Sequence, residues 1–459
     1  MTLGLAAIAA AACGSDTDPA TVAARDPIAL TTPLDRSPDP NVLEIDLEAR
    51  PSKHTYGASP ETAVWSFGGS IPGPLLDAKV GDRVIVHFKN SLPEPTTIHW
   101  HGIRLPAAMD GTLAMQAPIA PGASFDYAFT LKDAGLYWYH PHVRSDVQVQ
   151  KGLYGAIRVR GPAEPTVGDE RVLVLDDVRL KDDGSLSEYL DDNAKMMGRE
   201  GNTLLVNGVA NASIPVRAGA TTRLRLVNAA NGRFFNLRLP GHTWRVIGTD
   251  GGFVAAPYDT ERLLIAPGER YDVMVIVNGA PSAELDLLNE PYERGHASGH
   301  APTTTLAKVK ISGEAPLAGR TLPGAFPPIE RLPPAPSAVP LSLDEATRNG
   351  ELVFTVNGAV FPDVPKVMVE RGGLRFLDVT NASEMDHPFH LHGFFFQVLE
   401  QSGTPVPLER TGNKDTIIVP AKTKLRLLSR FDEPGMWMYH CHILEHAEGG
   451  MMGEIHVME

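Results

Sequence analysis

Short runs in which apolar and polar residues alternate recur along most of this 459-residue chain. Val84–Phe88, Arg223–Val227 and Val273–Val277 are examples, each rich in β-branched residues or leucine. Gly, Pro and Asn bound such runs, and a period of two places alternate side chains on one face of a strand. Helical periodicity is scarce, and Ser187–Met197 is the one stretch where we expect a helix. The pattern predicts an all-β fold.

The strand pattern is repeated three times along the chain. Val80–Asn90, Val216–Asn228 and Val369–Asn381 share the order of a turn followed by alternating apolar residues and a final Asn. Ala120–Tyr127 is likewise matched by Ala266–Asp272. Repeats of this length, each made of several strands, predict three consecutive β-sandwich domains.

The repeats set the expected domain boundaries. We place the three domains at residues 43–161, 165–313 and 343–459. Residues 314–342 are rich in proline and are predicted to form a stiff linker. Residues 14–42 are rich in Asp, Thr, Pro and Ala and are predicted to form a flexible tether.

The N-terminus has the pattern of an export signal. The apolar run Leu3–Ala12 precedes Cys13 and resembles the end of a bacterial lipoprotein signal, so residues 1–13 are expected to direct export. A lipid on Cys13 would then anchor the chain to a membrane at the periplasm or cell surface. The alternative is an ordinary cleaved signal. Elsewhere the sequence has no apolar run of about 20 residues, so no membrane-spanning helix is expected.

Charge and cysteine content further limit which class of protein this is. Lys and Arg number 41 against 55 Asp and Glu, a net charge of −14, which argues against nucleic-acid binding. The two cysteines are Cys13 and Cys441. Because Cys441 lies within a histidine cluster, we expect it to be a metal ligand and predict no structural disulfide.

Histidines are concentrated in four short stretches. Ten of the 16 fall there, in the first and third repeats: His99, His101, His140, His142, His387, His390, His392, His440, His442 and His446. The middle repeat has Asn236 and Arg238 instead and is predicted to be a metal-free spacer and substrate wall. Alternate residues of a strand lie about 6.5–7 Å apart, so paired imidazoles suit neighbouring metal ions about 3.5–4 Å apart.

Cys441 is predicted to face away from its flanking histidines. Met436–Tyr439 suggests a strand, on which His440 and His442 share one side and Cys441 takes the other. His387 stands at an odd offset from His390 and is expected to face the same way as Cys441. Thiolate, imidazole and thioether form the ligand set of a blue-copper site, here His387, Cys441, His446 and Met451. Zinc is less suitable because it has no redox chemistry.

Four motifs carry a family resemblance: His-Trp-His-Gly, His-Pro-His, His-Pro-Phe-His-Leu-His-Gly and His-Cys-His-x-x-x-His-x-x-x-x-Met. They resemble those of the three-domain multicopper oxidases, which include laccases, bacterial cuprous oxidases, spore-coat oxidases and bilirubin oxidases. The resemblance implies three consecutive cupredoxin-like Greek-key domains holding four copper ions, one type 1, one type 2 and two type 3. It also implies one-electron oxidation of a reductant coupled to four-electron reduction of dioxygen to water.

The same resemblance assigns roles to residues. His99 and His390 would hold the type-2 copper. The pair of type-3 copper ions would be held by His101, His140, His142, His392, His440 and His442. The resemblance leaves open how these six are divided between the two ions. Cys441 and Asp110 are the candidate catalytic residues, Cys441 as a covalent electron route and Asp110 as an acid near the type-2 copper. An Asp-Gly surface turn is the alternative for Asp110. Ala447 stands where relatives have a proton-supplying Glu, which leaves Glu445 and Glu448 as alternatives.

The reductant is less well defined by the sequence. A laccase-like activity on phenols and aromatic amines is expected, from a monomer whose partners are a small-molecule or metal-ion reductant and dioxygen. The alternative is a cuprous or metal-ion oxidase in copper tolerance, with Met385 and Asp386 binding Cu(I); that branch has an aspartate where this chain has Ser383. A non-catalytic scaffold relative would lack the copper ligands, and the three repeats disfavour a two-domain nitrite reductase.

Overall fold

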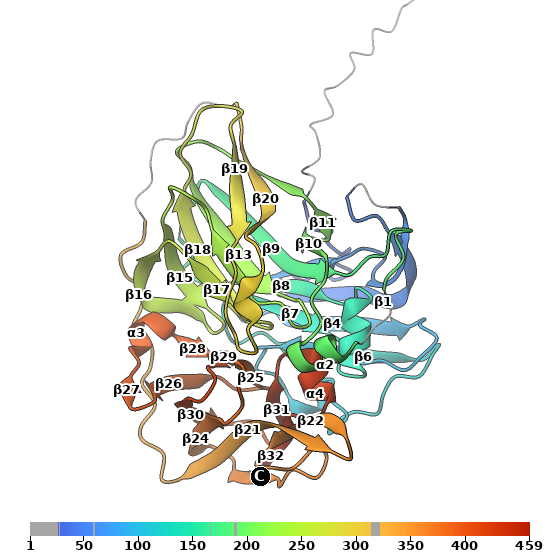
Figure 1. Cartoon of the computed structure of the whole chain (residues 1–459), viewed down its shortest axis with the longest axis vertical. Coiled ribbons are helices and arrows are strands. Elements are labelled where there is room, and N and C mark those ends of the chain that lie inside the picture. The colour runs from blue at the N-terminus through green and yellow to red at the C-terminus, as the bar shows by residue number, and fades with distance from the viewer. Residues whose placement is uncertain (1–25, 27, 58–59, 166, 188–190, 314–321) are drawn as a thin grey trace, which may run out of the picture.

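The computed structural model describes residues 26, 28–57, 60–165, 167–187, 191–313 and 322–459, and its strands form three successive β-bodies (Figure 1). The predicted export signal and Cys13 lie outside the described residues. Nearly all regular structure in the described part is strand, and the sheets pack in pairs as in cupredoxin-like domains. The predicted all-β fold is confirmed.

The first β-body has two sheets with four strands each, and its alternating sequence explains the packing. In Arg83–Asn90, for example, Val84, Val86 and Phe88 are buried while their neighbours face outward. One sheet has the order β2 (Thr62–Phe67), β1 (Val42–His54), β4 (Arg83–Asn90), β6 (Ser124–Thr130). The other has the order β3 (Gly73–Lys79), β8 (Gly155–Arg160), β7 (Gly135–His140), β5 (His99–His101).

The second β-body contains larger sheets and a core of its own. Its seven-stranded sheet has the order β11 (Val209–Ala210), β10 (Thr203–Val206), β9 (Asp169–Val178), β13 (Thr221–Asn228), β18 (Arg270–Ile276), β15 (Trp244–Thr249), β16 (Gly252–Thr260). Its five-stranded sheet has the order β12 (Ala212–Val216), β20 (Thr304–Ile311), β19 (Glu284–Asn289), β14 (Phe235–Arg238), β17 (Leu263–Ile265).

The third β-body resembles the first in its strand order around the histidines. One sheet has the order β22 (Glu351–Val356), β21 (Ala338–Arg348), β24 (Gly373–Asn381), β30 (Lys424–Phe431), β26 (Phe396–Gln401), β27 (Thr404–Pro405), with β28 (Asn413–Lys414) also paired to β26. The other has the order β23 (Val367–Glu370), β32 (Met452–Met458), β31 (Gly435–Cys441), β25 (His387–Leu391), β29 (Thr416–Val419).

The helices in the described residues are short. They are η1 (Ala107–Met109), α1 (Ser145–Gln150), α2 (Asp192–Met197), η2 (Ser298–His300), α3 (Leu408–Thr411) and α4 (Leu444–Glu448). Helix α2 occupies the second part of the predicted helical stretch, and the side chain of its N-cap residue Asp191 accepts the Ala194 N–H. The sequence pattern missed α1 and α4 because one or two turns are too short to show helical periodicity.

Two segments differ from their predictions. Residues 28–41 are not a free tether, because Ile28 is buried in the second core and its carbonyl oxygen accepts a bond from Asn207. Strand β21 begins at Ala338, inside the predicted linker, and pairs in parallel with β24 despite containing Pro340. In the described part of the chain, no helix combines the length and apolar character needed to cross a membrane.

The first and third β-bodies share one continuous hydrophobic core. Trp100 and Tyr139 of the first belong to the same buried cluster as Phe389 and Tyr439 of the third. These four residues lie on β5, β7, β25 and β31, the strands that carry most of the clustered histidines. The shared core therefore brings two histidine-bearing sheets face to face.

Candidate metal centre

Four histidine-bearing strands meet where the first and third domains face each other. β5 pairs antiparallel with β7, which sets His99 opposite His140. β25 pairs antiparallel with β31, which sets His390 opposite His440. The strand pairing is equivalent in the two domains, so each domain has one sheet edge that carries imidazoles, and these two edges lie against one another.

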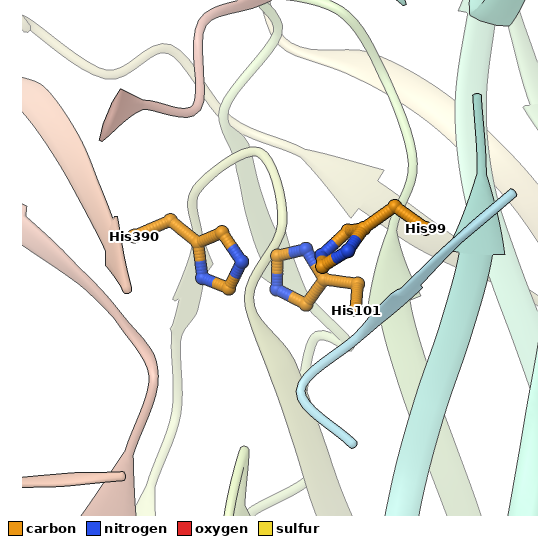
Figure 2. Close-up of side chains that lie close together, drawn as sticks. All are labelled: His99, His101 and His390. Carbon is orange, nitrogen blue, oxygen red and sulfur yellow. The ribbon is translucent and has the colours of Figure 1, made fainter. Parts of the chain in front are cut away.

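The two edges interdigitate through stacked rings. The ring centroids of His99 and His392 lie 3.8 Å apart, and those of His101 and His390 lie 3.7 Å apart. Figure 2 shows the ring of His390 approaching those of His99 and His101 from the opposite side. Each stack joins one domain to the other, so neither domain forms this site alone.

The eight imidazoles fall into overlapping groups of three. Within each group one ring nitrogen per residue lies within 4.8 Å of the others, and every member is buried. His101 belongs to two of the groups, and the stacked rings of His99 and His392 join the third group to them, so the groups form one continuous cluster. The groups are His99, His101 and His390; His101, His140 and His442; and His142, His392 and His440.

Backbone carbonyls hold the outer nitrogen of several rings. Nδ1–H of His99, His140, His390 and His440 donates to a carbonyl oxygen at 2.8–3.0 Å, because a carbonyl can only accept. This fixes the tautomer and leaves the lone pair on Nε2. Among the described residues, Nε2 of His99, His140 and His390 has no hydrogen-bond partner. Unpaired, buried and convergent nitrogens of this kind fit metal ions.

Burial keeps the cluster neutral. It lowers the pKa of His142 to about 3, assisted by the neighbouring His99 imidazole. Burial and nearby imidazoles likewise hold the pKa well below its ordinary value for His101, His140, His392, His440 and His442. Neutral imidazole is the form that binds metals, so the cluster is ready to coordinate at physiological pH.

Cys441 faces a second group on the opposite side of β31 from His440. Its Sγ lies 3.5 Å from Nδ1 of His387 and 3.7 Å from Nδ1 of His446, and the two Nδ1 atoms are 3.2 Å apart. All three residues are fully buried. Two imidazole nitrogens and one sulfur converging in this way form the trigonal donor set of a blue-copper site.

The outer nitrogens of these two imidazoles are also held. Nε2 of His387 lies 2.8 Å from the hydroxyl of Ser383, and Nε2–H of His446 donates to the Met196 carbonyl oxygen at 3.0 Å. The ring of Phe354 stacks on His446 at 3.9 Å between centroids. Both imidazoles are therefore fixed from behind with Nδ1 directed at Cys441.

Met451 is tied to the same group through its backbone. Its N–H donates to the His446 carbonyl oxygen, and its own carbonyl accepts from the Cys441 N–H at 3.1 Å. The side chain is fully buried in the shared core. Burial raises the pKa of the Cys441 thiol, and a bound metal cation reverses this effect because a coordinating thiol is deprotonated.

Asp110 is a buried part of the histidine cluster, not a surface turn. Its Oδ2 accepts Nδ1–H of His392 at 2.9 Å, and its carbonyl oxygen accepts Nδ1–H of His99. Gly111 makes this possible, since its φ is 79° and a Cβ there would lie 1.9 Å from the Ile98 carbonyl oxygen. Asp110 thus orients one histidine from each domain.

Two residues that the sequence motifs do not single out hold the other side of the cluster. Asp415 accepts Nδ1–H of His390 on its carbonyl oxygen, and its carboxylate lies 3.2 Å from Nε2 of His101. Arg270 donates to both carboxylate oxygens of Asp415, at 2.6 and 2.5 Å. Burial alone would raise the pKa of Asp415, but the Arg270 guanidinium holds it well below its usual range.

Arg270 connects all three domains. Besides Asp415 in the third, it donates to the carbonyl oxygens of Leu136 in the first domain and Asp250 in the second, each at 3.1 Å. The only sequence signal for it is weak: Arg270 occupies the repeat position at which the first domain has Ser124. The second domain has no counterpart of the clustered histidines, yet it supplies this central cation.

The two acidic candidates near the last histidine occupy different surroundings. Oε1 of Glu445 accepts from the Asn231 side chain at 2.8 Å in a buried site. Glu448 is exposed as a residue, but its Oε1 faces inward and accepts from both the N–H and the hydroxyl of Ser145 on α1. Burial raises the pKa of both carboxyls. Ala447, between them in sequence, is buried.

Met385 and Asp386 do not form an open metal site. Met385 is fully buried. Asp386 has both carboxylate oxygens occupied, one by the Tyr292 hydroxyl at 2.5 Å and the other by the Ala421 N–H at 2.8 Å. The expectation that these residues could bind Cu(I) near the surface therefore has no support in the geometry, because close packing around His387 encloses them.

Comparison with known families agrees with the fold and the donor set. Family models described as multicopper oxidase match residues 48–164, 169–307 and 333–459. Sheets of the cupredoxin kind that enclose buried histidines and a cysteine define a copper-dependent oxidoreductase with dioxygen as electron acceptor. The chain belongs to the multicopper oxidase family.

Individual relatives cover almost the whole chain. Multicopper oxidase MmcO of Mycobacterium tuberculosis is 31% identical over 88% of this chain and 85% of its own length. A solved metallo-oxidase from Campylobacter jejuni has a TM-score of 0.84 at 28% identity, covering 94% of each chain. A laccase-like oxidase, CueO from Ochrobactrum, has a TM-score of 0.81 at 27% identity, covering 94% of this chain and 100% of that one. The solved relatives thus include both a metallo-oxidase and a laccase-like oxidase.

Replacing Arg270 by Met should destabilise the protein and loosen the histidine cluster. Leaving the Asp415 carboxylate buried without its cation should cost about 3–5 kcal/mol, and copper content should fall while the blue absorption persists. Denaturant unfolding and copper analysis measure both effects. Arg245→Gln is the control, since its pair with Asp259 is more exposed, and should cost less than about 1 kcal/mol. Wild-type stability and copper content in R270M would contradict the proposed role of Arg270.

The copper-free protein should lose stability as pH falls below about 6.5. His142 and His387 have pKa values of about 3 when folded, so the unfolded chain binds more protons between pH 3 and 6.5. Each such histidine removes about 1.4 kcal/mol per pH unit in that window. Urea unfolding from pH 8 to 5 measures the slope, and His300→Gln in the exposed loop should leave it unchanged. A flat profile would show that the histidines are not held neutral.

Proposed function

We propose that this protein is a laccase-type oxidase that holds four copper ions and oxidises phenols or aromatic amines. The main observation that supports this proposal is the set of eight buried imidazoles, whose ring nitrogens converge between two domains. A separate Cys-His-His group lies next to this set. When bound, copper ions would supply one-electron transfer at the Cys441 group and multi-electron reduction of dioxygen at the imidazole cluster. The protein supplies the fixed positions of the donors.

We assign the ligands by proximity. His387, Cys441, His446 and the axial Met451 form the type-1 set, while His99 and His390 are left for the type-2 copper. Two convergent triads, each with histidines from both the first and the third domain, support a division of the type-3 ligands between two copper ions. One type-3 copper then takes His101, His140 and His442, and the other takes His142, His392 and His440.

The backbone of β31 links the two metal groups. His440 faces the imidazole cluster and Cys441 faces His387 and His446, so adjacent residues serve different sites. A bonded path of a few atoms from the sulfur to each flanking imidazole supports fast electron transfer between them. Asp110 accepts hydrogen bonds from His392 and, on its carbonyl oxygen, from His99, and is the buried acid beside the position that we assign to the type-2 copper.

An organic reductant is favoured over a metal ion. Met385, the methionine expected to bind Cu(I), is fully buried, and Asp386 has no free carboxylate oxygen. A soft-metal substrate site needs accessible sulfur or carboxylate ligands. The alternative, a cuprous or metal-ion oxidase in copper tolerance, therefore lacks its predicted site. A scaffold function is disfavoured because the chain retains the complete donor set.

We further propose that the protein is exported to the periplasm or cell surface and acts as a monomer. The apolar run Leu3–Ala12 before Cys13 supports export, with a lipid on Cys13 as the anchor. Large apolar side chains exposed among the described residues are few and separate in sequence, which supports a monomer. Mass spectrometry of the purified chain would identify a lipid on Cys13.

Replacing Cys441 by Ser should remove the intense blue absorption and reduce oxidase activity to background, because serine does not provide the soft thiolate ligand. The wild type should bind four copper ions per chain and the variant three. Metal analysis and absorption spectra measure this. Met451→Leu is the matched control, since it should keep the blue band and raise the reduction potential. A blue C441S protein would refute the assignment.

Phenol and Cu(I) rates test the reductant class. We expect the copper-loaded enzyme to consume dioxygen faster with 2-methoxyphenol than with Cu(I), and Met385→Ala to leave the ratio of the two rates within about twofold, because Met385 is enclosed. Oxygen uptake measures both rates. Preferred turnover of Cu(I), with selective loss in M385A, would instead establish the metal-ion oxidase.

A further inference from the structure

Two methionines and a histidine form a row across the outer face of the third domain, on the strands β23, β32 and β31 (Figure 1). Met368 of β23 pairs with His456 of β32, and His456 pairs with Met436 of β31, so the three side chains share one face of the sheet. Met368 is 50% exposed, and the other two are partly exposed. Neighbouring strands lie about 4.8 Å apart, and methionine is long and flexible, so both thioethers can reach the imidazole between them.

The first domain adds a further sulfur to the end of this row. The Met436 N–H donates to Sδ of Met115 at 3.3 Å, which places this thioether beside β31. Met115 is also partly exposed. The row of sulfur atoms therefore continues from the third domain to the point where the first domain meets it.

The imidazole in the row is held from behind. Nε2–H of His456 donates to Oε2 of Glu454 at 3.0 Å, because a carboxylate can only accept, and Nζ of Lys366 lies 3.0 Å from the same oxygen. This leaves the lone pair of His456 on Nδ1. A carboxylate behind an imidazole is the arrangement that orients metal-binding histidines, and Asp110 does the same for His392 in the imidazole cluster.

The donor types select the kind of metal ion. Thioether sulfur binds soft ions such as Cu(I), whereas Mg²⁺ and Ca²⁺ prefer oxygen ligands. Imidazole also suits copper. A partly exposed row of thioethers around an oriented imidazole therefore suits one Cu(I) ion.

The same face of β31 leads from this row to the imidazole cluster. Met436, Met438 and His440 are alternate residues of the strand, so their side chains share one face. Met438 is buried and stands opposite Glu454 of β32. Cys441 faces the other side of β31, so the row is directed at the imidazole cluster and not at the Cys441 group. Met438 thus offers a soft ligand between the surface and the buried imidazoles.

We propose that Met368, His456 and Met436 capture one Cu(I) ion, and that Met438 relays it to the imidazole cluster while the copper-free protein is being loaded. The inference goes beyond the proposed function, because it concerns the supply of copper and is independent of the reductant. The transfer is a ligand exchange in which copper–sulfur bonds break and copper–nitrogen bonds form. The receiving imidazoles are neutral, so no proton has to leave, and no electron is transferred.

Capture is tested with Ag(I), which has the charge and the ligand preference of Cu(I) but does not exchange electrons with the enzyme. The copper-loaded protein is titrated with Ag(I) by calorimetry in chloride-free buffer, and every protein carries Cys13→Ser so that this thiol does not bind silver. Met368→Leu and His456→Gln each remove one ligand. His87→Gln is the matched control, since His87 is a half-exposed histidine of β4 that lies between two carboxylates.

We expect the wild type to bind one Ag(I) ion per chain at this row. Met368→Leu and His456→Gln should each weaken binding by at least about tenfold, and His87→Gln should bind as the wild type does. Unchanged silver affinity in both ligand variants would overturn the capture site and would leave this face as an apolar surface only.

Transfer is tested by loading the copper-free protein with Cu(I) in the absence of oxygen. Metal analysis of samples taken over time gives total copper, and the blue absorption after admission of air gives the filling of the Cys441 group. Met438→Leu conserves volume and should cost less than about 1.5 kcal/mol of stability. It should keep silver affinity within about twofold, but fill the imidazole cluster about tenfold more slowly. The blue band should develop at the wild-type rate.

The capture variants should slow filling of the imidazole cluster only when Cu(I) is scarce. Wild-type loading by Met368→Leu and His456→Gln from scarce Cu(I) would overturn the supply role, even if silver binding were lost. Equal slowing of the blue site and the cluster in Met438→Leu, or no slowing, would overturn the relay. A wild type that binds silver at the row but takes up fewer than four copper ions would contradict the proposed function and not the capture site.

Discussion

The buried ion pair between Arg270 and Asp415 holds the histidine cluster in register. Arg270 comes from the second domain and donates to groups in all three, while Asp415 contacts His101 of the first domain and His390 of the third. A buried pair contributes little net stability, but losing one partner leaves a buried charge uncompensated. The arrangement gives a structural role to the second domain, which lacks the clustered histidines: it supplies a cation that contacts both of the other domains where they meet.

Around this pair, the protein holds each imidazole from behind and presents the other nitrogen inward. Carbonyl oxygens, Asp110, Asp415, Ser383 and the Met196 carbonyl perform the same task at different rings. Because the site is buried, the imidazole rings stay neutral. Buried ring nitrogens without a partner would destabilise the folded protein if no metal ion bound them. The same burial that destabilises charged groups therefore prepares the site for copper.

The imidazole cluster and the Cys441 group are both buried, but they have different neighbours. The imidazole cluster lies inside the shared core of two domains, whereas the segment just before His387 contacts the second domain, through Tyr292 with Asp386 and Gly295 with Met385. The Ser383 hydroxyl contacts the outer nitrogen of His387. Tyr292 with Asp386 and Glu448 with Ser145 are further polar contacts close to the Cys441 group in sequence.

The sequence alone determined the all-β class, and the family was recognisable from short motifs that are local in the chain. Alternation with period two is local, so it already predicted that Cys441 faces away from His440, and the structure confirms it. Contacts between distant segments were not predictable in this way. Arg270 and Asp415 lie 145 residues apart, and neither stands in a motif; the packing of Ile28 also depends on which surfaces meet. Only the tertiary structure decides such pairings, because they arise from burial between domains and not from periodicity along the chain.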